Sequence, residues 1–155
     1  MRIEKRAVLD EVSQTADYTG AKLQDSPNGD AKAYERIMTT EADGEKLERF
    51  WREACVYFCD EMKRFLKNDR ALRDGETGEV TGHEFVLELG RSFDEALWPS
   101  IEKESQSYFV MYLLSKWFVF TNKSEAEGYA ASAASLLEGV HRKACYKKKP
   151  TRPSY

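Results

Sequence analysis

Two cysteines, Cys55 and Cys59, lie four positions apart in a segment with helical spacing, so both thiols could reach one metal ion. A structural zinc site usually takes four ligands, and the chain offers only His83 and His141 to complete one. Neither histidine stands in a ligand-like spacing such as H-x3-H. Because free cysteine is among the residue types most often buried, we interpret the pair as small buried thiols beside an apolar stripe. We expect no metal site.

Catalytic chemistry has little support in the sequence. A cysteine nucleophile needs a base and an activating environment, and no glycine-rich oxyanion loop precedes a cysteine. Acid–base catalysis needs paired carboxylates in a dry pocket, whereas the candidates here lie between apolar positions, as solvated faces do: Glu84, Glu88, Asp94, Glu95, Glu102 and Glu104. Walker, G-x-G-x-x-G and EF-hand patterns are absent. We expect a non-enzymatic protein with no catalytic residues and no cofactor.

A basic segment closes the chain. From Gly139 to Tyr155 there are six Lys or Arg residues and no acid, which leaves 18 basic and 27 acidic residues in positions 1–138. The body therefore carries about −9 and the tail +6, within a formal net charge of −3. The tail residues that could contact a partner are Arg142, Lys143, Tyr146, Lys147, Lys148, Lys149, Arg152 and Tyr155.

This segment has three interpretations. It could bind phosphates, with lysines as point charges and tyrosines as stacking surfaces. It could be an arm that docks on an acidic protein surface, such as the body of a neighbouring copy. It could also be a solvated tail whose cations complement the dipole of the last helix. The net charge excludes only a uniformly basic nucleic-acid binder.

The elements that position these residues are mostly helical. The chain has 155 residues, 41% apolar and 33% charged, which excludes a disordered tail and suits one helical domain. Apolar residues at three-to-four spacing predict a helix from near Thr40 to residues 67–68 and a shorter one over residues 4–14. Gly20 and a polar cluster predict a loop-rich region over residues 20–39.

One short β excursion is expected around residues 79–89. Residues 74–78 have turn chemistry, and the alternation that follows places Phe85, Leu87 and Leu89 on one face of a strand. A lone strand needs a partner. That partner is either residues 71–73, in a small hairpin, or another subunit.

The C-terminal half predicts an antiparallel helical hairpin. Residues 101–120 become apolar on every side, which is typical of a helix surrounded by others. A capping box at Ser124 and Glu127 begins a last helix that runs to about Cys145. Its alanines are expected to allow close approach to the preceding helix; they are Ala130, Ala131, Ala133 and Ala134. Trp98 is the tryptophan expected to be partly exposed.

Together these elements predict a mainly α fold: a bundle of about four helices with one β excursion and an extended basic arm. We expect a single domain over residues 1–146 and a tail over residues 147–155. No apolar region follows the N-terminal residues, so we expect no secretory signal. The most apolar stretch, residues 108–120, is too short to span a bilayer. Three cysteines fit free thiols in a reducing compartment.

The order of these features resembles a known family. A stretch from Leu47 to Cys55 with Trp51 at its centre is followed by the β excursion and by a bulky helix through Trp117. An alanine-rich helix and a basic, proline-containing end then close the chain. Over about residues 43–150, this order resembles the small helical head–tail connector proteins (adaptor or head-completion proteins) of tailed phages and prophages.

The resemblance implies a structural protein that forms a ring between the portal and the tail, after self-association that can wait for the portal. Its partners would be portal and tail-completion proteins, with DNA only as passing cargo and no membrane. It would reside in the bacterial cytoplasm during assembly and then at the head–tail junction of the virion. In such a ring the strand with Phe85 would pair between subunits. The alternative is a small nucleic-acid-associated or regulatory helical protein that uses its basic C-terminal tail.

Overall fold

The fold is taken from a computed structural model that describes residues 1–24 and 43–149. The predicted loop region beyond residue 24, the helix start near Thr40, and the tail residues Arg152 and Tyr155 lie outside these ranges. The described residues form helices and one small antiparallel sheet, and the predicted mainly α fold is confirmed. The elements in chain order are β1 (Arg2–Glu4), α1 (Lys5–Gln24), α3 (Gly44–Glu61), β2 (Leu66–Arg73), β3 (Val80–Leu87), the short 3-10 turn η2 (Glu95–Leu97), α4 (Trp98–Thr121) and α5 (Lys123–Ala144).

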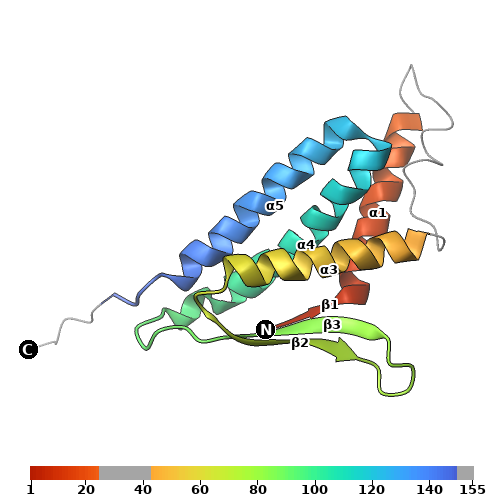
Figure 1. The fold of residues 1–155 in the computed structure, drawn as a ribbon. Coiled ribbons are helices and arrows are strands. Elements are labelled where there is room, and N and C mark those ends of the chain that lie inside the picture. The colour runs from red at the N-terminus through yellow and green to blue at the C-terminus, as the bar shows by residue number, and fades with distance from the viewer. Residues whose placement is uncertain (25–42, 150–155) are drawn as a thin grey trace, which may run out of the picture.

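Helix α4 is the centre of the bundle. It contacts α1, α3 and α5, and it runs antiparallel to α5 from one end of the molecule to the other (Figure 1). Its buried side chains point in all directions, as its sequence predicts; they include Ile101, Phe109, Val110, Leu113, Leu114 and Phe118. Val119 and Phe120, at its last turn, are exposed. Among the described helices, none is both long enough and apolar enough to cross a membrane.

The α4–α5 hairpin is confirmed, but its details differ from the prediction. Only Asn122 separates the two helices, and α5 begins at Lys123 rather than behind a capping box. The Ser124 hydroxyl donates to the Asn122 side chain (2.7 Å) instead of capping the helix. Of the small residues of α5, Ala126 and Ala133 face α4, and Val140 continues their seven-residue spacing. The other predicted contact alanines are exposed in the described structure: Ala130, Ala131 and Ala134.

The sheet has the order β1-β3-β2, so β3 is the central strand. Residues 71–73 belong to β2 and pair with β3, which confirms the hairpin alternative. The predicted pairing of β3 between subunits is wrong for Phe85, whose N–H donates to the Met1 carbonyl (2.9 Å) while Asp69 of β2 lies opposite it on the other edge. Leu87 pairs with Leu66, and Leu89 lies beyond the end of the strand. The N-terminal residues supply the partner that the strand needs.

Two helix ends differ from the predictions. Helix α3 ends at Glu61, not at residues 67–68, because the chain turns there and enters β2, whose backbone groups are satisfied by β3. Helix α1 continues to Gln24 through Gly20, ten residues beyond the predicted end at position 14. Buried small and branched residues recur every four positions along it, and packing against α4 extends the helix past its local signals.

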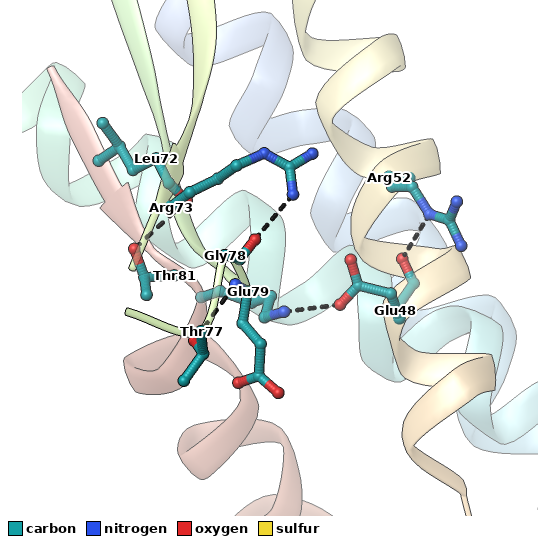
Figure 2. Close-up of polar contacts among 9 residues, drawn as sticks. Glu48, Arg52, Leu72, Arg73, Thr77, Gly78, Glu79 and Thr81 are labelled. Carbon is teal, nitrogen blue, oxygen red and sulfur yellow. Dashed lines mark hydrogen bonds and ion pairs between the residues drawn. The ribbon is translucent and has the colours of Figure 1, made fainter. Parts of the chain in front are cut away.

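The β2–β3 turn is the turn predicted at residues 74–78. The Asp74 carboxylate accepts from the backbone N–H groups of Glu76 and Thr77 (both 2.8 Å), and these bonds hold its pKa below the usual value. Gly78 supplies the positive φ of 70° that closes the turn. Its carbonyl accepts from Arg73 (2.9 Å; Figure 2). The Lys5–Glu48 ion pair joins α1 to α3.

Gly82 of β3 provides a test of the sheet. A Cβ at this position would lie 2.5 Å from the Ile3 carbonyl of β1, so Gly82→Ala forces the N-terminal strand away from β3. We expect the free energy of unfolding to fall by roughly 1–3 kcal/mol, measured by urea titration. Gly44→Ala is the matched control, because nothing lies within 4 Å of its added carbon. Equal stability of the two variants would contradict the β1–β3 pairing.

Candidate partner-binding surface at the C-terminal end

The C-terminal arm begins in a fixed place. After α5 ends at Ala144, Lys147 forms an antiparallel bridge with Phe93, in the segment between β3 and η2. The Lys148 N–H donates to the Ser92 carbonyl (2.7 Å). The first residues of the predicted tail are therefore extended but held on their own chain. The described chain continues to Lys149, at the end of the molecule where α4 begins (Figure 1).

Most of the predicted contact residues are exposed. Those within the described part of the arm are Arg142, Tyr146, Lys147, Lys148 and Lys149. Tyr146 exposes about half of its surface (52%) beside these cations. The interpretation of Lys143 as a partner contact requires correction, because its side chain is only 21% exposed, and its ammonium pairs with Glu104 and donates to the Ser100 hydroxyl (2.8 Å). Lys143 joins α5 to α4.

A groove that sequence reasoning missed lies beside the arm. It has a volume of about 550 Å³ and lies between the end of β3 and the start of α4; its lining residues are Leu87, Leu89, Gly90, Arg91, Phe93, Glu95 and Trp98. Trp98 is half-buried there, in keeping with the partial exposure expected of it. The backbone bridge at Phe93 makes the arm continuous with this groove. We refer to these seven lining residues as the β3–α4 groove.

Cys55, Cys59 and His83, which were considered as possible metal ligands, lie together in another part of the molecule. They line a cavity of about 470 Å³ between α3 and the sheet, together with Asp69 of β2. The Asp69 carboxylate contacts the His83 ring (Nε2 to Oδ2, 2.8 Å). His141 lies apart from them and packs against the Phe65 ring. Strand pairing across the sheet brings Asp69 and His83 together, although 14 positions separate them.

The thiols of this cavity are not activated. Burial raises the pKa of Cys55 to about 12. Burial, followed by the charge and hydrogen bond of Asp69, raises the pKa of Cys59 to about 11. Both thiols are therefore protonated at neutral pH, and a protonated thiol is neither a good nucleophile nor a metal ligand. Within residues 1–24 and 43–149, no group of three or more His, Cys, Asp or Glu side chains could hold a metal ion.

Four of the six candidate carboxylates make structural contacts: Glu84, Glu88, Asp94 and, through Lys143, Glu104. Glu84 bridges Arg2 of β1 (2.8 Å) and Arg70 of β2 (2.6 Å), and hydrogen bonds from these guanidinium groups lower its pKa. The Asp94 carboxylate accepts from the Ala96 N–H and caps η2. Glu88 lies 3.8 Å from the Lys67 ammonium. These contacts stabilise strands and turns, and the surface best suited to a functional contact is the arm with its groove.

Comparisons with known proteins add no relative: no family model, curated protein or solved structure matches the chain.

The rate of cysteine alkylation tests whether the Cys59 thiol in this cavity is protonated at neutral pH. At pH 8 we expect iodoacetamide to modify exposed Cys145 well before Cys59, because a pKa of about 11 leaves about one Cys59 thiolate in a thousand. Since the pKa is raised, the Cys59 rate should continue to increase up to about pH 11. Peptide mass spectrometry at timed intervals measures each rate, with the urea-unfolded chain as the control for intrinsic reactivity. Equal rates for Cys59 and Cys145 in the folded protein at pH 8 would reveal an activated thiol.

Proposed function

We propose that this chain is a non-enzymatic head–tail connector subunit that assembles into a ring between the portal and tail of a phage or prophage. The observation that carries the proposal is the cationic arm, whose exposed lysines leave the bundle at a point set by the Lys148–Ser92 backbone bond. A segment held in this way presents its charges to a partner with less loss of conformational entropy than a free terminus. Portal and tail-completion proteins are the partners proposed for it.

The distribution of charge supports a ring. A ring uses heterologous interfaces, in which one surface of a subunit meets a different surface of the next. The arm is basic, whereas exposed acids are spread over the rest of the molecule, on α1, α3, the β2–β3 turn and α5: Asp10, Glu11, Glu45, Asp60, Glu61, Glu76, Glu79, Glu125, Glu127 and Glu138. Exposed cations are interspersed with these acids, but the body keeps a net negative charge, and opposite net charges of arm and body favour a directional contact between neighbours. An acidic surface facing the exit channel would also repel the passing DNA.

The alternative, a nucleic-acid-associated or regulatory protein, draws on the same residues. Exposed Lys147 to Lys149 beside the half-exposed Tyr146 ring could contact phosphates and stack on a base. Binding of this kind releases counterions, so its affinity falls steeply as salt rises. A filter-binding titration with single-stranded DNA at several salt concentrations therefore separates the two proposals. A connector should bind DNA weakly at physiological salt.

Removal of residues 147–155 tests the connector proposal. We expect about tenfold or lower incorporation into particles assembled with the portal protein encoded in the same genome, because the arm supplies the charges that the partner meets. Quantitative mass spectrometry of purified particles measures the incorporation. The joint charge reversal Lys147→Glu, Lys148→Glu and Lys149→Glu should reproduce the loss, and the matched Lys→Arg triple should not. Unchanged incorporation of the truncated chain would rule out a role for the arm.

A further inference from the structure

We infer that the β3–α4 groove binds an acidic segment of a partner protein, anchored by one large apolar side chain of that segment. This inference rests on the proposed function, because it names the chemistry of the partner that the arm meets. The groove has a volume of about 550 Å³, within the range of roughly 300–1,000 Å³ typical of ligand pockets. Its apolar residues are half-buried, which leaves apolar surface for a guest; they are Leu87, Leu89, Phe93 and Trp98.

The lining combines four apolar side chains with the charged Arg91 and Glu95, so it suits a guest with one apolar group among polar ones. Leu87 is the last residue of β3, and Trp98 is the first residue of α4, so the groove is built between two regular elements. Phe93 lies between them, and its backbone is bridged to Lys147. A side chain that enters this open groove loses part of its water contact, and the burial of its apolar surface favours binding. The groove can thus act as the anchor of a larger contact.

The surroundings of the groove define the charge of the guest. Arg91 is exposed and belongs to the lining, and Lys147 and Lys148 pass beside it because their backbone is joined to Phe93 and Ser92. Successive side chains of an extended segment point to opposite faces, so Lys147, which lies opposite Phe93, shares the face of the Phe93 side chain and Lys148 does not. Carboxylates that flank the apolar anchor of a guest would therefore face Arg91 and Lys147. Electrostatic complementarity of this kind sets the choice and orientation of the partner.

Two features favour a protein over a nucleic acid. The η2 turn beside the groove carries Asp94 and Glu95, and Glu95 belongs to the lining, so a continuous run of phosphates would meet acids there. A protein segment can place its carboxylates toward the arm and leave neutral residues opposite Glu95. Two leucines of the lining also match an aliphatic or aromatic side chain, whereas the bases of a nucleic acid would stack only on Phe93 and Trp98.

A titration followed by NMR tests this inference on the full-length chain. The probe is a synthetic peptide of alternating Asp and Glu with one central phenylalanine. We expect saturable shifts of the Trp98 indole N–H and of the backbone signals of Arg91 and Lys147. Replacement of the central phenylalanine by serine should weaken binding by about tenfold or more. A single-stranded oligonucleotide of equal charge should leave the Trp98 signal in place.

Variants of the chain show whether the groove itself carries the binding. The double variant Arg91→Glu and Lys147→Glu should weaken peptide binding by about tenfold or more. Each single variant, Arg91→Glu or Lys147→Glu, is compared with Lys22→Glu at the far end of α1, which changes the net charge equally and should bind like the original chain. The inference is overturned if Trp98 does not shift, if the serine peptide or the oligonucleotide binds equally well, or if Lys22→Glu causes the same loss. The two proposals can fail separately. If the peptide does not bind, but the chain without residues 147–155 is lost from particles, the groove inference is rejected and the connector proposal is retained.

Discussion

The burial of Phe85 joins the sheet to the helices, and the rest of the fold depends on it. Its ring is fully buried and contacts the ring of Phe58 from α3 (centroids 4.6 Å apart) and that of Phe109 from α4 (6.0 Å). Each aromatic pair of this kind contributes about 0.5–1.5 kcal/mol beyond the burial of its area. Because β1 and β2 both pair with β3, this one side chain positions three strands against two helices. The N-terminus, the hairpin and the bundle are thus fixed relative to one another.

The position of the arm follows from this arrangement. Once β3 is fixed on α4, the short segment between them runs past the end of the bundle, where α5 also ends. The backbone of that segment, at Ser92 and Phe93, is then available to the chain that leaves α5. Lys143 reinforces the same end by joining α5 to α4 through Glu104. The cations of the arm and the apolar lining of the groove therefore become neighbours, although some 50 positions separate them in the sequence.

The candidate site was only partly predictable. The arm could be found because a run of cations without acids is visible in any stretch of sequence. The groove could not be found in this way. Its apolar residues have the spacing of an ordinary strand and turn, and nothing in the local sequence indicates that they line one groove: Leu87, Leu89, Phe93 and Trp98. The same limit explains Lys143, which reads as one more basic residue of the arm until α4 brings Glu104 beside it. Cys55, Cys59 and His83 were recognised separately, and only sheet pairing places Asp69 among them.

The sequence by itself determined the elements whose signals are local: the apolar α4, the tight connection to α5, most of α3, and the Asp74–Gly78 turn. Periodicity and turn chemistry act between residues a few positions apart, so they can be read without knowing the fold. The tertiary structure decided where α3 stops, how far α1 continues, and that residues 2–4 form a strand. The end of α3 depends on the pairing of β2 with β3, and the β1 strand depends on partners more than 75 positions away, such as Phe85 for Met1. Such partners become known only when hydrophobic burial brings the segments together.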